Sequence, residues 1–428
     1  MGAMAGRLAA RRLSRDAILL CVSACFADLG YQGVTALFPL YIVFRLHAAV
    51  AWYGVITAVA FGGGAAVGYL GGRAGDRVDR KYLIIAGNAF IPLMALSGLA
   101  HMLWLAGLLF ILGWWARYFR TPVRQALLVL VTRPDDRGLA FGFLHALDIA
   151  GGMFSALIAL LLISIGLKIE TVMLWAVVPL AISTVVLLFV QRTELFHEST
   201  PLSMVAPRAK QTGGIEPTGG AEHSGAGERT LLIWLLVSAT LYGFSFYNLG
   251  FPILSAAHGH GATGYGATRG YELGVLAYVV YLGVSAVSGY ALGAGRVPAL
   301  RSLWLLGYLP SALASGLIGV SQLLHLSAIA FYLFIAMLGL GMGGVETQEP
   351  TLVSSLVRST RLSRGMGFLT VSRSIGQFLS NLVMGLLFTL SSSVPYFYAF
   401  ASACLAAVVL AIAELRYRAH AHARADRA

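Results

Sequence analysis

Charged side chains stand inside long apolar runs of this 428-residue sequence, where a charge is costly to place. A charged residue at the centre of a bilayer costs about 2.5–3.5 kcal/mol even on the lenient insertion scale. Acids and bases balance within these runs, so we expect internal ion pairs, some of whose acids take up and release protons. The residues concerned are Asp28, Asp148, Glu346, Glu349, Arg117, Arg120, Arg124 and Arg373.

Glu346 and Glu349 are three positions apart, so their carboxylates share one face of a helix. Two neighbouring carboxylates in an apolar setting are unfavourable as a pair of anions, which favours protonation of one of them. We therefore predict that this pair carries protons. In the alternative interpretation, both acids pair with Arg361 or Arg364 and lie outside any central cavity.

Asp28 has few cations near it in the sequence, and Tyr31 and Gln32 continue the polar character of its segment. A buried acid without an adjacent cation is either paired across helices or functional, and we predict the functional role.

Asp148, in the segment HALDIAGG, is interpreted instead as the structural partner of Arg117 or Arg124. The candidates for structural ion pairs are Arg120, Arg124, Asp148 and Arg373.

Tyr242, Tyr247 and Asn248 cluster around Gly243 and Gly250 in an uncharged segment. Aromatic side chains with one amide suit an apolar substrate pocket that has a single orienting hydrogen bond. Interface anchoring and ordinary helix packing are the alternatives for the tyrosines. The substrate-cavity candidates are Tyr31, Gln32, Tyr242, Tyr247 and Asn248.

The composition indicates which elements must position these residues. Hydrophobic residues make up 58% of the chain and charged residues 11%, against about 25% charged in soluble domains. Several apolar runs reach the ~20 residues that a membrane-spanning helix needs. The alternation of a membrane barrel is absent. We predict an all-α polytopic membrane protein with twelve helices, near 17–45, 52–72, 82–101, 103–131, 138–165, 171–191, 230–256, 271–294, 300–322, 326–357, 364–390 and 394–416.

Lysine and arginine set the predicted topology. With the N-terminus in the cytoplasm, the cations of the external loops are Arg45, Lys168 and Arg269, and every other cation outside the spans falls on the cytoplasmic side. Both termini are therefore expected in the cytoplasm, with the protein in the plasma membrane.

The chain is expected to consist of two similar halves joined by a linker rich in glycine. Thr121-Pro122 precedes Arg137-Gly138 at nearly the spacing at which Glu349-Pro350 precedes Arg364-Gly365, which indicates two pseudo-symmetric six-helix bundles. The predicted division is a basic tail at 1–16, a first bundle at 17–191, a flexible cytoplasmic linker at 192–229, a second bundle at 230–416 and a tail at 417–428.

The loop GRAGDRVDRK, which runs from Gly72 to Lys81, resembles the signature loop of the major facilitator superfamily. Asp79 replaces the usual glycine and Ala74 a common leucine. The segments ADLGYQ, RYFRTPVRQALL and RGLAFGFLHALD are similar to a prokaryotic branch of that superfamily whose substrates are poorly defined, although Gln32 and Gln125 replace acids. The resemblance implies a gating role for Gly72, Asp76, Arg77, Arg80 and Lys81.

The same resemblance implies that helices 1, 4, 7 and 10 line a central cavity. Arg117 then falls where many proton-driven members carry an arginine that takes part in proton movement. The proton-coupling candidates are Asp28, Arg117, Glu346 and Glu349.

These observations predict a monomeric secondary transporter that exports a small solute in exchange for protons by alternating access. The alternatives are proton-coupled or passive uptake of an organic anion, and a transporter-like membrane sensor. The sequence lacks a phosphate-binding loop and a zinc-protease motif, so we expect no enzyme. We expect no cofactor, and we expect no metal site at His258 and His260, which have no further ligands nearby. The expected partners are the solute, protons and membrane lipid, and no nucleic acid.

Overall fold

The structure is a computed structural model, and it describes residues 13–75, 77–132, 137–191, 225–261, 266–294, 299–356 and 362–425. The regular elements in these ranges are all helical. Nine helical stretches in the described part of the chain are long and apolar enough to cross a membrane, and Arg229–Gly243 adds a shorter apolar helix. The predicted fold class, an all-α polytopic membrane protein, is confirmed.

The helices of the first half follow one another in the order of the predicted spans. They are α2 (Arg15–Leu40) with η1 (Tyr41–Arg45); α3 (Val50–Thr57), η2 (Ala58–Gly62) and α4 (Gly63–Gly75); α5 (Arg80–Phe90), α6 (Leu93–Leu96) and η3 (Ser97–Leu99); α7 (Leu103–Leu130); α8 (Arg137–Ser164); and α9 (Ile169–Trp175) with α10 (Val177–Leu188).

The second half repeats this arrangement. Its helices are α11 (Gly225–Gly243) and α12 (Gly250–Gly261); α13 (Gly266–Ala294); α14 (Ala299–Ser302), η6 (Leu303–Tyr308) and α15 (Leu309–Leu323); α16 (Ala328–Leu356); α17 (Leu362–Leu387); and α18 (Val394–Ala425). The last helix thus runs beyond the predicted end at 416. Most of the predicted linker lies outside the described residues.

One predicted helix is wrong in its continuity. The segment 230–256 was expected to be a single helix, but α11 ends at Gly243 and α12 begins at Gly250. The backbone N–H of Asn248 donates to Oδ1 of Asn381 at 2.9 Å, and the side chain of Asn248 accepts from the N–H of Gly250 at 2.9 Å. These bonds satisfy backbone groups that a helix would otherwise satisfy, which permits non-helical backbone among the packed helices.

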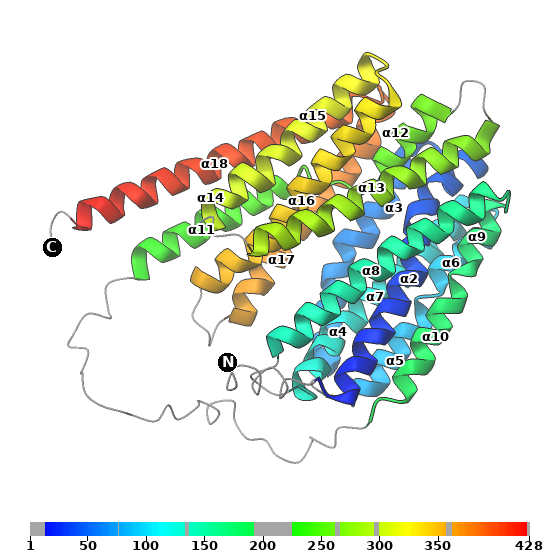
Figure 1. Cartoon of the computed structure of the whole chain (residues 1–428), viewed down its shortest axis with the longest axis horizontal. Helices are drawn as coiled ribbons and strands as arrows, with labels where there is room; N and C mark the ends of the chain where they lie inside the picture. The colour runs from blue at the N-terminus through cyan, green and yellow to red at the C-terminus, as the bar shows by residue number, and fades with distance from the viewer. Residues whose placement is uncertain are drawn as a thin grey trace, which may run out of the picture.

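The two halves lie side by side as bundles of nearly parallel helices (Figure 1). Their contact is formed by α8 with α13, α3 with α17 and α2 with α12. A Cβ atom at Gly54 would lie only 2.6 Å from the carbonyl oxygen of Asn381 and 2.7 Å from Cα of Gly385. Glycine therefore lets the backbones of α3 and α17 approach closely, as small residues do in membrane helix pairs.

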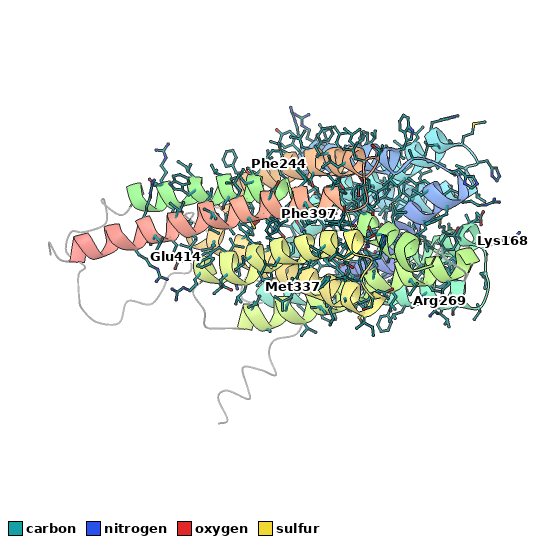
Figure 2. All side chains as sticks on the ribbon, turned by 90° about the horizontal axis from the view of Figure 1, so that it is seen from above. Lys168, Phe244, Arg269, Met337, Phe397 and Glu414 are labelled. Atoms are coloured by element: carbon teal, nitrogen blue, oxygen red, sulfur yellow. The ribbon has the colours of Figure 1, made fainter. Side chains whose placement is uncertain are left out.

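The bundle has two ends, which we name by their lysines. Figure 2 shows Lys168 and Arg269 at the same end of the molecule, far from Glu414. This end, the Lys168 face, also carries Arg45, which pairs with Glu170 at 2.6 Å.

The opposite end, the Lys81 face, holds the loop between α4 and α5. Asp79 caps α5 by accepting from the N–H of Lys81 at 2.9 Å. The ammonium group of Lys81 in turn binds the carbonyl oxygens of Leu188 and Val190, at the end of α10.

Candidate functional site

Asp28 on α2 is the most isolated of the buried acids. Its side chain is 4% exposed. The hydroxyl of Tyr31 donates to its carboxylate, and Nε2 of Gln32 lies 3.4 Å from the same oxygen. No lysine or arginine of the described residues forms an ion pair with it. A buried carboxylate held only by neutral partners is an unusual arrangement, because an unpaired charge is costly in an apolar setting.

Arg117 on α7 lies against aromatic rings beside this acid. Its guanidinium carbon is 4.9 Å from the ring centre of Trp114, 5.0 Å from that of Tyr31 and 5.8 Å from that of Tyr118. The faces of aromatic rings attract cations, so these contacts hold the charge in place. Tyr31 therefore contacts both Asp28 and Arg117, which brings two of the predicted proton-coupling residues together.

The other arginines of α7 differ in their partners. Arg124 lies 3.3 Å from a carboxylate oxygen of Asp148 on α8. Arg120, predicted to form an ion pair, forms none with a described residue; it donates to the amide oxygen of Asn88 on α5. The side-chain nitrogen of Asn88 is held at 2.7 Å by Thr184 on α10. Burial of Arg120 is thus compensated by an amide, which can accept hydrogen bonds without a charge.

The second half contains its own ionic cluster. Glu349 on α16 is fully buried and accepts from Arg373 on α17 at 2.5 Å and from the hydroxyl of Tyr308 at 2.6 Å. Glu346 is half-exposed and lies 3.3 Å from the same arginine. Arg373 therefore bridges the two acids that were predicted to carry protons. Of the two alternative partners, Arg361 lies outside the described residues. Arg364 lies in α17, but its side chain is not described.

The two clusters occupy corresponding helices with the charges exchanged. In the first half a cation on α7 pairs with an acid on α8, and in the second half an acid on α16 pairs with a cation on α17. Each pair ties the fourth helix of its bundle to the fifth.

Polar side chains also join the halves. The hydroxyl of Tyr278 on α13 donates to Oε1 of Gln32 at 2.7 Å. The hydroxyl of Tyr53 on α3 donates to Oδ1 of Asn248 in the break between α11 and α12. Gln32 and Asn248, both predicted for the substrate cavity, thus hold the two bundles together. Gln32 in addition connects this contact to Asp28.

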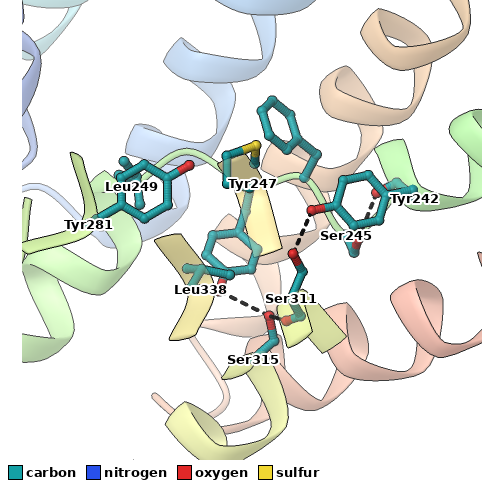
Figure 3. A pocket seen from close by; sticks show the side chains of 10 residues that line it. Tyr242, Ser245, Tyr247, Leu249, Tyr281, Ser311, Ser315 and Leu338 are labelled. Carbon is teal, nitrogen blue, oxygen red and sulfur yellow. Dashed lines mark hydrogen bonds between the residues drawn. The ribbon is translucent and has the colours of Figure 1, made fainter. Parts of the chain in front are cut away.

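Tyr242 and Tyr247, the remaining cavity candidates apart from Tyr31, line a pocket in the second half (Figure 3). The pocket is bounded by the end of α11, the break that follows it, α13, α15 and α16. Its empty space is about 290 Å³, which includes the mouth.

The structure describes part of the predicted gating loop. Asp76 lies outside the described residues. Gly72 packs near Pro122 of α7, Arg77 is exposed, and Arg80 opens α5. Lys81 binds the end of α10, as described above. Asp79, which replaces the glycine of the signature, is the cap that begins α5.

Four contacts of the candidate site were not predicted from the sequence, because each joins residues that are distant in sequence. Asn88, Tyr278, Tyr308 and Tyr53 hold a charge or a neighbouring helix. A polar side chain in an apolar run is the signal that could have selected Asn88. Single tyrosines in such runs are common and carry no comparable signal.

Paired helical bundles with buried ionic clusters and an internal pocket define a solute carrier of the membrane. The chain belongs to the Major Facilitator Superfamily, whose model matches residues 20–380. The family is one of membrane transporters and not of enzymes.

Solved transporters share the fold. A bacterial homologue of the human lysosomal transporter Spinster, in an inward-facing and unoccupied conformation, aligns with a TM-score of 0.64 at 15% identity, over 94% of this chain and 97% of that one. A transporter of the POT family in complex with a thioalcohol-conjugated peptide aligns with a TM-score of 0.71 at 14% identity, over 94% and 96% of the two chains.

Curated relatives match a shorter segment. The multidrug resistance protein MdtH of Proteus mirabilis (strain HI4320) is 37% identical over 134 residues, and that of Yersinia enterocolitica is 35% identical over 134 residues. The matched segment covers 29% of this chain and 32% of each relative, so the chain matches about a third of their length.

Proposed function

We propose that the chain exports a small lipophilic solute in exchange for protons. The single observation that carries this proposal is the environment of Asp28, which is 4% exposed and held by Tyr31 and Gln32 without an ion pair among the described residues. Asp28 is neutral when it holds a proton. When it is ionised, its negative charge must be compensated by neighbouring groups.

A change of charge on Asp28 has a path to the contact between the halves. Gln32 lies beside its carboxylate and accepts from Tyr278 of the other half at 2.7 Å. When Asp28 takes a proton, its carboxylate loses the negative charge that strengthens its bonds with Tyr31 and Gln32, so both bonds weaken. Alternating access needs such a link, because the proton must favour one arrangement of the bundles over the other.

The direction of transport is proposed on a different basis. The relatives that match 134 residues are multidrug resistance proteins, which supports export. A second candidate function is uptake of an organic anion. Arg117 favours it, because aromatic rings hold its charge and no carboxylate of the described residues pairs with it.

The test is transport by the purified full chain in sealed lipid vesicles with an imposed pH gradient. Candidate solutes carry no titratable group, so that they do not redistribute with pH by themselves. Proton exchange predicts that vesicles acidic inside accumulate the solute while the internal pH rises, and that an uncoupler abolishes accumulation. Accumulation driven by an acidic exterior would support uptake instead, and equilibration that ignores the gradient would refute proton coupling. Vesicles without protein are the control.

We further propose that the Lys81 face is cytoplasmic and that the protein lies in the plasma membrane. Arg77, Lys81 and Arg301 lie at this face, whereas the Lys168 face carries few cations. Single cysteines at Lys168 and at Arg301, in a chain without its native cysteines, test this orientation. An impermeant maleimide added to intact cells should label the cysteine at 168 and spare that at 301. The reverse pattern would invert the topology.

A further inference from the structure

The pocket in the second half offers hydrogen bonds but no charge. Five elements contribute to it: the end of α11, the break between α11 and α12, α13, α15 and α16. It is lined by Tyr242, Ser245, Phe246, Tyr247, Leu249, Tyr281, Ser311, Ser315, Leu338 and Met342. None of these side chains is an acid or a base of the kind that pairs with an ionic group. A formally charged group would therefore enter without a counter-ion, which is unfavourable in a buried site.

The hydroxyl protons on one side of the pocket are already engaged. Tyr242 donates to Oγ of Ser311 at 2.9 Å, and Ser311 donates to the carbonyl oxygen of Gly307 at 3.0 Å. Ser315 donates to the carbonyl oxygen of Ser311 at 2.9 Å. A hydroxyl has one proton, so the 3.2 Å contact between Tyr247 and Ser315 must have Tyr247 as its donor. The oxygens of Tyr242 and Tyr247 are left as acceptors.

Tyr281 differs from these residues. It is 8% exposed, and its hydroxyl has no hydrogen-bond partner among the described residues. Figure 3 shows Tyr281 on the opposite side of the pocket from Tyr242, with Ser311 beside the latter. The hydroxyl oxygen of Tyr281 is not one of the fully buried unpartnered atoms of the described residues, so it is open to the pocket and free to donate to a ligand acceptor. The pocket therefore presents one free donor facing two acceptors, between aromatic and aliphatic walls.

We propose that this pocket binds one end of the transported solute, an uncharged aromatic ring bearing a hydroxyl group. This inference rests on the proposed function, since it names the chemical class that the transporter selects. The ring packs among Phe246, Leu338 and Met342. Its polar group accepts from Tyr281 and donates to Tyr242 or Tyr247. The narrow space admits one end of a solute, and the flexible side chain of Met342 lets the walls adapt.

The pocket is also connected to the ionic cluster of the second half. The ring of Tyr242 stacks on that of Tyr308, with centroids 4.4 Å apart and planes inclined by 10°. The hydroxyl of Tyr308 donates to Glu349, which pairs with Arg373. A ligand that displaces Tyr242 therefore acts on the buried ion pair through one intervening ring.

The test measures binding of three probes to the full chain in lipid nanodiscs by equilibrium dialysis, with empty nanodiscs subtracted. The probes are 2-naphthol, its methyl ether and the 2-naphthoate anion. The proposal predicts that naphthol binds, that the ether binds roughly three- to tenfold more weakly because it lacks the donor, and that naphthoate does not compete. Naphthoate binding at least as tight as naphthol, or no binding of naphthol, would overturn it.

A pair of tyrosine variants locates the site. Tyr281→Phe removes the free hydroxyl and should weaken naphthol binding roughly three- to tenfold. Tyr332→Phe is the matched control, because its hydroxyl bonds the carbonyl oxygen of Leu273 outside the pocket. Equal naphthol affinity in wild type and Tyr281→Phe would overturn the proposed binding site. The proposed function would still stand if gradient-driven transport remained intact. If instead the proposed function is wrong, transport is independent of the pH gradient while naphthol still binds.

Discussion

Buried acids in the two halves have partners of different kinds. Asp28 is held by a hydroxyl and an amide, whereas Glu349 is held by a guanidinium and a hydroxyl. A carboxylate paired with Arg373 is compensated as an anion, and loss of its charge would strand the arginine. We therefore expect Asp28 to respond to protons directly and Glu349 to act mainly in holding α16 to α17.

This difference predicts unequal effects of two neutral variants. Glu349→Gln should reduce the free energy of unfolding by at most about 3–5 kcal/mol, because a buried pair loses one member while Glu346 still contacts Arg373. Glu346→Gln is the matched control; its side chain is 49% exposed, and its loss should cost about 0–1 kcal/mol. Thermal unfolding in detergent compares them. Equal midpoints for both variants would show that the buried pair is not a structural tie.

For single residues, the sequence identifies which charged side chains are unusual but not which partners they contact. The acids and arginines inside apolar runs are visible without a structure, because each is costly there. Arg361 and Arg364 were the alternative partners of Glu346 and Glu349 on grounds of nearness in sequence. The described partner is Arg373, which a neighbouring helix brings into contact. Pairing across helices depends on the packing of the bundle, which no local pattern encodes.

Among the elements, the break between α11 and α12 joins the halves. Tyr53 of α3 reaches Asn248 there, and a Cβ at Gly250 would lie 1.9 Å from the tyrosine hydroxyl oxygen. Only glycine leaves room for that contact. The break thus depends on Gly250 and on the backbone bonds of Asn248.

Gly250→Ala should therefore weaken the contact near the Lys168 face. Spin labels at Arg45 and Arg269, exposed residues of the two halves, report the separation between them by pulsed electron resonance. The variant should add a population with a longer distance than wild type shows.

The control for that experiment is Gly283→Ala, since a Cβ there meets no atom within 4 Å. Both substitutions add one methyl group to a helical residue. Identical distance distributions for Gly250→Ala and wild type would mean that the tyrosine contact does not hold the halves together.

The length of the apolar runs predicts most helices but does not predict the break between α11 and α12. The residues from Phe244 to Leu249 are largely apolar, so they continue the run on both sides. These residues are not helical because they bond to α3 and α17, which belong to other segments of the chain. The short stretch between η3 and α7, in contrast, coincides with the predicted division near His101.

Over the whole molecule, the two halves repeat an architecture and exchange its charges. The cation of the first half and the acid of the second occupy the corresponding helices α7 and α16. The repeat was visible in the spacing of proline and Arg-Gly pairs, whereas the exchange of sign emerges only with the partners known. Asp28, Gln32 and Tyr278 connect the acid of one half to a helix of the other. We therefore expect protonation of Asp28 to change the contact between the two bundles.

The most direct measurement compares gradient-driven accumulation with solute exchange for Asp28→Asn in one preparation of vesicles. The amide cannot carry a proton, so accumulation against a gradient should be lost, while exchange of solute for solute, which needs no net protonation, should proceed at close to the wild-type rate. Glu272→Gln, which alters a surface ion pair with Arg269, is the control and should retain both activities. Full gradient-driven accumulation by Asp28→Asn, at a normal protein level, would contradict proton coupling through this carboxylate.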